Sequence, residues 1–433
     1  MTISYDITWD LDPTAATFRG RTSLRFNGKR SHAELAAVQV RRATLNGRDV
    51  PWDGSRLALR TPDDSHAAQP SRSAEPLHAA DGLHTTEPLS ATEPLGGTGP
   101  LRTAEPLPAT GPSPAAGPLP ATGPLSTAEP SHTADGLHTA DSSHATGFSH
   151  AGAALHGPDD NVLEVDADFA YAEDHGFRRA TVDGDTYLYT YHYPNWTQRS
   201  FACFEPNLRG AVTMNINAPD ASVLTSDTTS PVVPYAITAV VGPWAEVGGN
   251  VYAMRTRAAE RDHGEAVSQL FARSITYFEH LLGIPYPYGT CAAVFVPDIP
   301  SLAFSSAGLV LFDDDAFDAL ATREPRYATT VVSHEVAHQW SGNLVDAEPW
   351  LVEGLATYLS RLATEELVPG SRPWSDLDNA PLPDRPYAAH LSRIVAVEEA
   401  IGRTALVQGL TTYFRRHAHT TASWAHLQAC WRQ

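Results

Sequence analysis

The stretch His334-Glu335-Val336-Ala337-His338-Gln339-Trp340 decides how the rest of the chain is interpreted. Two histidines four residues apart lie on the same face of a helix, and neutral imidazole is a good zinc ligand. Glu335, beside the first histidine, is placed to take a proton from zinc-bound water. This is the HExxH arrangement of zinc metallopeptidases. The stretch therefore predicts a helix that carries two metal ligands and a general base.

The flanking sequence extends this helix and supplies a second one. Upstream, residues 327–332 are compatible with a partly buried helix, and Gly342 is a natural stop after it. Pro349 can open a second helix over residues 350–359, because proline is tolerated at a first helical position. Glu353 on that helix is the candidate third ligand, since an unpaired charge among apolar neighbours is costly. The alternatives are a chance His and Glu pattern on a solvated helix and an ordinary surface carboxylate at position 353.

These segments resemble the aminopeptidase N family of zinc metallopeptidases. HEVAHQWSGNLV and VEGLATYL are similar to that family's two zinc-bearing helices. Outside one insert the resemblance covers nearly all of the chain, including the segments Tyr5–Asp12, Phe18–Arg21, Phe201–Pro206 and Phe278–Tyr288. It implies a peptide substrate, one Zn²⁺ per chain held by His334, His338 and Glu353, and Glu335 as the general base.

The resemblance also implies a role for Tyr387. In the family a tyrosine at the matching distance before a helix-ending glycine, here Gly402, donates a hydrogen bond to the developing oxyanion. An aromatic side chain packed in a helical core is the alternative.

The residues that would position a peptide depart from the family pattern. Ala303 and Ser305 align with the strand whose glutamate binds the free amino group of the substrate, and Tyr191 and Tyr193 align with two further amine-binding positions. A hydroxyl gives an ammonium a weaker hydrogen bond than a carboxylate does, although aromatic faces can also hold a cation. The connection between His338 and Glu353 is shorter than in the family as well.

Composition narrows the class of protein. The net charge is -20, from 50 acidic and 30 basic residues, which argues against nucleic acid and anionic membranes as partners. The start of the chain lacks a signal-peptide pattern and no apolar run is long enough to span a membrane. Three widely spaced cysteines make a disulfide framework improbable. A cytoplasmic location is expected, and the oligomeric state stays open.

The organisation is expected to be α+β with two domains. A saddle-like β-sheet domain is predicted over residues 1–250, and a thermolysin-like zinc-binding catalytic domain over 251–433, without the family's usual C-terminal helical domain. An insert over 66–158 interrupts the first domain, and Ala74 to Ala151 can be cut into thirteen hexads. Its composition is typical of a disordered segment, with a left-handed β-helix as the alternative.

The predicted function is zinc-dependent hydrolysis of peptide bonds, with release of the N-terminal residue expected from the resemblance. Two alternatives stay open. The missing amine-binding carboxylates and the short ligand connection favour a non-catalytic relative that keeps the fold as a binding or structural protein. The same replacements are also compatible with a zinc hydrolase that has no preference for a free amine.

Overall fold

The computed structural model describes residues 3–59, 160–204, 208–219, 221–227, 229–374 and 386–431, without the side chains of 321, 322, 386 and 387. All of these residues belong to one compact unit of the chain. The insert predicted over 66–158 lies entirely outside the described residues.

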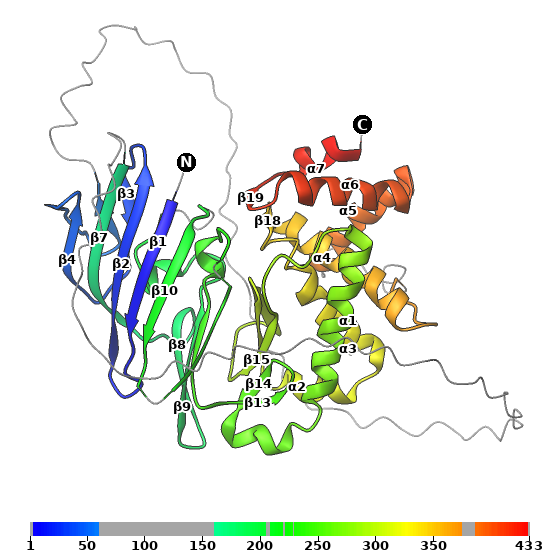
Figure 1. Cartoon of the computed structure of the whole chain (residues 1–433), viewed down its shortest axis with the longest axis horizontal. Helices are drawn as coiled ribbons and strands as arrows, with labels where there is room; N and C mark the ends of the chain where they lie inside the picture. The colour runs from blue at the N-terminus through cyan, green and yellow to red at the C-terminus, as the bar shows by residue number, and fades with distance from the viewer. Residues whose placement is uncertain are drawn as a thin grey trace, which may run out of the picture. The chain divides into compact units, whose positions relative to one another are not determined.

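The amino-terminal half begins with a six-stranded sheet. Its strands follow the order β10-β1-β2-β7-β4-β5, and β1, β2, β7 and β10 lie side by side in Figure 1. The members are β1 (Ile3–Asp10), β2 (Thr17–Asn27), β4 (Gln39–Leu45), β5 (Arg48–Asp49), β7 (Asp160–Ala170) and β10 (Ala211–Asn217). The segments Tyr5–Asp12 and Phe18–Arg21 resemble the opening hairpin of the family, and β1 and β2 do pair antiparallel, with Ile3 opposite Phe26.

Alternation of apolar and polar residues explains this sheet. In β1 the side chains of Ile3, Tyr5, Ile7 and Trp9 are all buried, while the residues between them are partly or fully exposed. Successive side chains of a strand point to opposite faces, so one face of β1 packs into the core and the other meets solvent. Residues 161–165, whose alternating pattern predicts a strand, form the first half of β7.

A second sheet, of four strands, carries residues that reach the candidate site. Its order is β11-β12-β9-β8, and the strands are β8 (Gly176–Val182), β9 (Asp185–Tyr191), β11 (Ser222–Thr225) and β12 (Ala239–Gly242). Two further short strands, β3 (His32–Glu34) and β6 (Arg56–Ala58), pair antiparallel with each other. Because β9 ends at Tyr191, the loop that follows it starts with His192 and Tyr193.

The third sheet has five strands in the order β13-β14-β15-β17-β16. They are β13 (Trp244–Gly248), β14 (Val251–Met254), β15 (Ala292–Val296), β16 (Ala303–Ser306) and β17 (Leu309–Asp313). The sheet starts at Trp244, shortly before the predicted domain boundary at residue 250, which stays a prediction.

The apolar run of residues 308–312 predicts a strand, and the family resemblance implies that it is the edge strand beside the active site. The position is wrong, because β17 lies inside the sheet, between β15 and β16. The edge strand is the shorter β16, which pairs antiparallel with β17. The physical reason is the tight turn at Ala307 and Gly308, where a φ of +72° at Gly308 lets the chain fold back.

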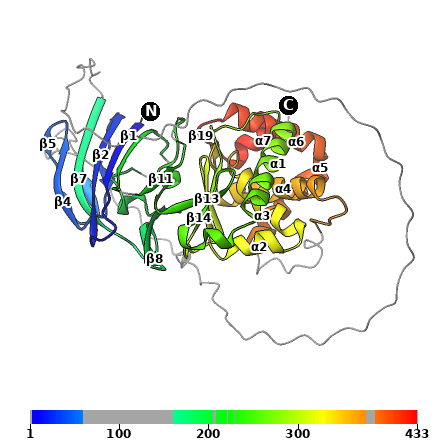
Figure 2. The same cartoon turned by 60° about the horizontal axis from the view of Figure 1, so that its bottom comes forward.

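Helices account for most of the carboxyl-terminal half. They are α1 (Gly264–Leu282), α2 (Ala316–Thr322), α3 (Pro325–Ala337), α4 (Pro349–Leu367), α5 (Pro386–Ile401), α6 (Arg403–Arg416) and α7 (Trp424–Trp431). A two-stranded pair, β18 (Val345–Asp346) with β19 (Thr420–Thr421), joins the start of α4 to the start of α7. Figures 1 and 2 both show α1 beside β13 and β14, whereas α3 contacts β16. One continuous apolar core joins these helices to the third sheet.

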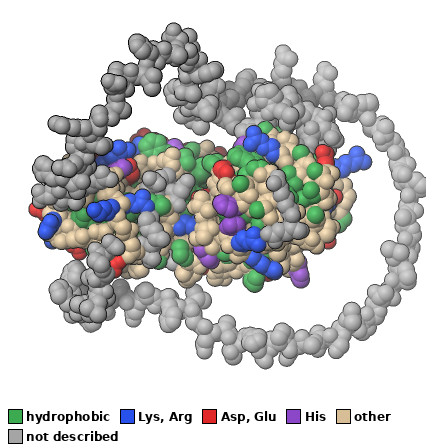
Figure 3. All heavy atoms as spheres, turned by 90° about the horizontal axis from the view of Figure 1, so that it is seen from above, with side chains coloured by type: hydrophobic (Ala, Val, Ile, Leu, Met, Phe, Trp, Pro, Cys, Tyr) green, Lys and Arg blue, Asp and Glu red, His purple; other side chains and the backbone are tan. Residues whose placement is uncertain are grey.

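The surface shows no segregation of charge on the face in Figure 3, where basic side chains lie in separate small groups over both halves of the described chain. Among the helices described, none combines the length and the apolar character needed to cross a bilayer.

Buried His192 predicts how stability depends on pH. The side chain is 1% exposed, Nδ1 donates to the carbonyl of Ile237 at 3.2 Å, and Nε2 accepts from the Ser200 hydroxyl at 2.8 Å. Burial lowers the pKa of His192 from 6.5 to about 4. Between these pH values only the unfolded chain takes up this proton, so the contribution of neutral His192 to stability is complete above pH 6.5 and is lost as the pH falls towards 4.

We expect the free energy of unfolding to fall by about 1.4 kcal/mol per pH unit in that window from this residue alone. Denaturant unfolding of the wild type and of His192→Gln at several pH values measures the slope. His192→Gln should be less stable than the wild type at pH 7, and its free energy of unfolding should depend less steeply on pH. His280→Gln, on the exposed face of α1, is the control and should keep the wild-type slope. Equal slopes for His192→Gln and wild type would contradict the assignment.

Candidate active site

Helix α3 presents the two histidines of the HEVAH stretch. Pro325 occupies its first turn, and the helix ends at Ala337 with His338 as the C-cap residue. His338 keeps right-handed helical dihedral angles, φ -60° and ψ -19°, so it continues the face on which His334 lies. The imidazole Nε2 atoms of His334 and His338 are 3.1 Å apart. The predicted i, i+4 geometry is therefore present at the end of this helix.

Helix α4 presents Glu353. As predicted, it begins at Pro349, and Glu353 follows in the next turn. Gly354 allows a close approach of α5, because a Cβ at this position would lie 3.1 Å from the carbonyl oxygen of His390. The shortened connection after His338 still brings the carboxylate to the histidines, since Glu353 Oε2 lies 3.4 Å from His334 Nε2 and 3.6 Å from His338 Nε2.

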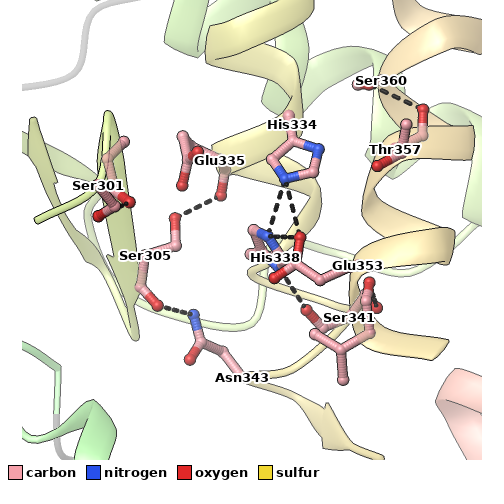
Figure 4. A network of polar contacts seen from close by, with 12 residues as sticks. Ser301, Ser305, His334, Glu335, His338, Ser341, Asn343, Glu353, Thr357 and Ser360 are labelled. Carbon is pink, nitrogen blue, oxygen red and sulfur yellow. Dashed lines mark hydrogen bonds and ion pairs between the residues drawn. The ribbon is translucent and has the colours of Figure 1, made fainter. Parts of the chain in front are cut away.

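The three side chains converge on one point, as Figure 4 shows. Their ligand atoms all lie within 4.8 Å of one another, and Glu353 Oε2 is buried without a hydrogen bond of normal geometry. Zinc bonds of about 2.1 Å in a tetrahedron separate the ligand atoms by roughly 3.4 Å. The measured separations of 3.1, 3.4 and 3.6 Å bracket that value. The residues present therefore fit a tetrahedral metal ion with one position left over.

The electrostatics of the site also suit a cation. Burial opposes charge on the His338 imidazole, but the Glu353 and Glu335 carboxylates outweigh it and raise the pKa of His338 to about 9. Burial likewise opposes charge on Glu353, yet the two histidines hold the pKa of Glu353 well below its usual range. The buried Glu353 carboxylate thus favours a positive charge close to it.

Ser341 connects the two ligand-bearing helices. Its backbone carbonyl accepts a hydrogen bond from His338 Nδ1 at 3.0 Å, which leaves the Nε2 lone pair free to face a metal. Its hydroxyl donates to the carbonyl of Val352 at 2.9 Å, one residue before Glu353. One residue of the short connection therefore orients the second histidine directly and holds the start of the helix that carries the carboxylate.

The backbone next to Ser341 is fixed from the amino-terminal half. Arg209 donates to the carbonyl of Gly342 at 2.8 Å. Gly342 has a φ of +109°, a conformation that favours glycine, and a Cβ there would lie 3.1 Å from Val352. Glycine at 342 therefore serves the close packing of the connection as well as its turn.

Removing the Ser341 hydroxyl is expected to weaken zinc binding. Ser341→Ala keeps the carbonyl that orients His338 but removes the bond to Val352, so zinc affinity should fall by roughly tenfold, the lower end of effects at groups that support metal ligands. Competition with a chromophoric chelator measures the dissociation constant.

Ser341→Thr should restore most of the affinity. Ser392→Ala is a matched control, because the Ser392 hydroxyl donates to a carbonyl within its own helix, that of Ala389. If Ser341→Ala and Ser392→Ala bind zinc equally well, Ser341 does not position the ligands.

Glu335 and the predicted substrate-binding residues line one cleft with the histidines. The cleft has a volume of about 480 Å³, and its lining includes Tyr191, Tyr193, Ala303 and Ser305 as well as Glu335. The structure therefore brings all of these predicted residues together. The Ser305 hydroxyl donates to the backbone carbonyl of Glu335 at 2.7 Å, which ties the edge strand β16 to α3 (Figure 4).

Tyr387 lies in the first turn of α5, but its side chain is outside the described residues. Its predicted role as an oxyanion donor stays a prediction.

Several lining residues were not found by sequence reasoning. Tyr235, Phe304, Asn343 and Asp346 also line the cleft, and Asn343 donates to the carbonyl of Ser305 at 3.4 Å. Asn343 follows the HExxH stretch closely, so its place near the site could have been inferred. Tyr235 is far away in the chain, and only the tertiary contact of its hydroxyl with Asp346, at 3.2 Å, shows its position.

Comparison with known proteins finds peptidases among the similar sequences. Residues 268–385, which include both ligand-bearing helices, match the model of the peptidase family M1 domain. Aminopeptidase N of Streptomyces lividans is 26% identical over 329 residues, 60% of this chain and 38% of that protein. Aminopeptidase M1 of Arabidopsis thaliana is 28% identical over 214 residues, 40% of this chain and 24% of that protein. The chain thus spans well under half the length of these relatives.

Solved structures confirm the α+β fold. Native yeast LTA4 hydrolase superposes with a TM-score of 0.64 at 14% sequence identity, covering 99% of this chain and 64% of that chain. Yeast LTA4 hydrolase in complex with bestatin gives a TM-score of 0.65 with the same coverage. At this identity the likeness is one of fold alone. Together, the matched domain and the aminopeptidase relatives show that this chain is similar to the peptidase M1, or aminopeptidase N, family, with which residues 268–385 share a domain.

Proposed function

We propose that the chain is a zinc-dependent metallopeptidase that hydrolyses peptide bonds. The observation that carries the proposal is the convergence of His334, His338 and Glu353, with their ligand atoms within 4.8 Å of one another, in a cleft that Glu335 also lines. Three protein ligands with one open position are typical of catalytic zinc sites, whereas structural sites have four.

The residues of the chain have separate tasks in this proposal. When bound, zinc would supply an activated water and a positive charge beside the scissile carbonyl. His334, His338 and Glu353 hold the ion. Glu335 accepts a proton from the water and passes it to the leaving amine. Its backbone is held in place by Ser305, whose hydroxyl donates to the Glu335 carbonyl.

Tyr387 is proposed, from the family resemblance, to donate a hydrogen bond to the carbonyl oxygen as negative charge develops on it. Such preorganised donors are often the largest contribution to catalysis. One zinc per chain and a cytoplasmic location belong to the same proposal.

Metal removal tests this function. A chelator should abolish hydrolysis of a mixture of internally quenched and aminoacyl peptide reporters, and one equivalent of zinc should restore it. The control is the same chelator already saturated with zinc, which should leave the activity intact. A chain that binds zinc but cleaves none of the reporters would instead support the non-catalytic alternative. Activity that survives complete zinc removal would exclude zinc chemistry.

A further inference from the structure

Part of the cleft lining is a cluster of four aromatic side chains. Tyr191 and Phe304 are 5.5 Å apart between ring centroids, Tyr193 and Phe304 are 6.0 Å apart, and Tyr193 and Tyr235 are 5.6 Å apart. All four rings line the cleft. At these distances the rings pack on one another, edge to face or tilted. They form a continuous wall and leave no gap between facing rings in which an ammonium group would be enclosed.

The carboxylates of the cleft are already committed. Among the described residues that line it, three are acidic: Glu335, Asp346 and Glu353. Glu353 faces both histidines at 3.4 and 3.6 Å. Asp346 is 3% exposed, and its two oxygens accept from the Tyr235 hydroxyl at 3.2 Å and from the Thr421 hydroxyl at 3.3 Å. Neither is free to pair with a substrate amine.

Glu335 is equally unsuited to hold an ammonium. In the proposed chemistry its carboxylate faces the water at the metal site, and its backbone carbonyl accepts a hydrogen bond from the Ser305 hydroxyl of the edge strand. The Glu335 carboxylate is therefore needed as the general base and is not available to bind a substrate amine.

The edge strand beside the metal site offers only uncharged groups. Tyr191 donates to the Ser301 hydroxyl at 3.3 Å, and Ser301 donates to the carbonyl of Ala303 at 2.8 Å. The Ser305 hydroxyl is used by the carbonyl of Glu335. A protonated amine placed here would lose water without gaining a charged partner, which is costly, whereas an amide would lose much less.

We propose that this cleft selects substrates in which the residue before the scissile bond has an acylated, uncharged α-nitrogen. The side chain of that residue is apolar or aromatic and packs against the wall of Tyr191, Tyr193, Tyr235 and Phe304. This chemistry is shared by peptides with an acylated amino terminus and by bonds in the interior of a longer peptide. The inference rests on the proposed function and names its substrate class.

A binding measurement tests the class without turnover. Zinc-loaded Glu335→Gln is titrated by calorimetry with N-acetyl-phenylalaninamide and with phenylalaninamide at pH 6.5, where an α-amino group of pKa about 7.7–8.0 is mostly protonated. The acetylated amide should bind at least about tenfold more tightly, the effect of losing one charge-assisted interaction. Equal binding, or tighter binding of the free amine, overturns the inference even if the chain proves to be a zinc peptidase.

Turnover then distinguishes the two sources of such a substrate. Three reporters are compared: phenylalanine p-nitroanilide, its N-acetyl derivative, and an internally quenched peptide blocked at both ends. Cleavage of the acetylated anilide identifies capped termini, and cleavage of the quenched peptide alone identifies interior bonds; either supports the class. Preference for the free-amine anilide overturns it. If no reporter is cleaved, the proposed function fails, and the binding result still decides the inference.

Variants that supply the missing charge should reverse the preference. Tyr193→Glu and Ala303→Glu, the second on the edge strand, each place a carboxylate in the cleft lining. We expect either variant to raise, by roughly tenfold, the kcat/KM for the free-amine anilide relative to the kcat/KM for the acetylated anilide. Val38→Glu adds the same charge at a site that is 59% exposed and far along the chain from the cleft residues, so it should leave the ratio alone. A ratio unchanged in two folded lining variants contradicts the inference.

Discussion

Replacing Glu335 with glutamine is expected to lower kcat by roughly 10²–10⁴-fold, the range found for general acid–base groups. Glutamine keeps the size of the side chain and cannot accept the water's proton. The ligands His334, His338 and Glu353 are untouched, so zinc content should stay at one per chain. Steady-state kinetics on the reporter that the wild type cleaves best, together with metal analysis, measure both quantities.

Glu399→Gln is the matched control for this substitution, because Glu399 is exposed on α5 and does not line the cleft. It should have wild-type kinetics. If Glu335→Gln retains full activity with normal zinc content, a different group is the base and the assignment of Glu335 is wrong.

Glu353→Gln is expected to weaken zinc binding by roughly 10²–10³-fold, if the total affinity of a zinc site is shared among its ligands. Glu353 is the charged member of the candidate ligand set, and its carboxylate holds the pKa of His338 above its ordinary value. The amide keeps the shape but gives a neutral, weaker oxygen ligand. Competition with a chelator of known zinc affinity measures the change, and peptidase activity at limiting zinc should fall in parallel.

Glu366→Gln provides the comparison on the same helix, since Glu366 is exposed on α4 and is not part of the converging group. Wild-type zinc affinity in Glu353→Gln would mean that the third ligand lies elsewhere.

The ligand-bearing helices could be predicted from the sequence because their determinants are local. The spacing of His334 and His338 follows from helical periodicity alone, and Pro349 fixes where α4 begins. Glu353 was the uncertain member, since its reach depended on a shortened connection. The structure places it 3.4 and 3.6 Å from the two imidazoles, because Ser341 holds that connection at both ends.

The other parts of the site depend on contacts that local patterns do not contain. Arg209 reaches the carbonyl of Gly342 across 133 positions of the sequence, and Tyr235 reaches Asp346 across 111. The edge position of β16 is not predicted either, because a four-residue strand with two serines gives a weaker signal than the apolar β17 that pairs with it. Strand order is a property of the assembled sheet rather than of either segment.

The substrate side of the cleft shows how a resemblance and a structure complement each other. Alignment to the family indicated that Ser305, Tyr191 and Tyr193 replace amine-binding groups. The structure adds what those residues do here: one hydroxyl is used by the Glu335 carbonyl, and the rings of Tyr191 and Tyr193 both pack against Phe304. The replacement has therefore produced an uncharged wall.

Anomalous diffraction at the zinc absorption edge from crystals of the zinc-loaded chain tests the central claim most directly. We predict one strong peak, about 2.0–2.2 Å from the Nε2 atoms of His334 and His338 and from a carboxylate oxygen of Glu353. A chain that takes up zinc but shows its peak elsewhere, or shows a peak bonded to the histidines without Glu353, would contradict the three-residue site.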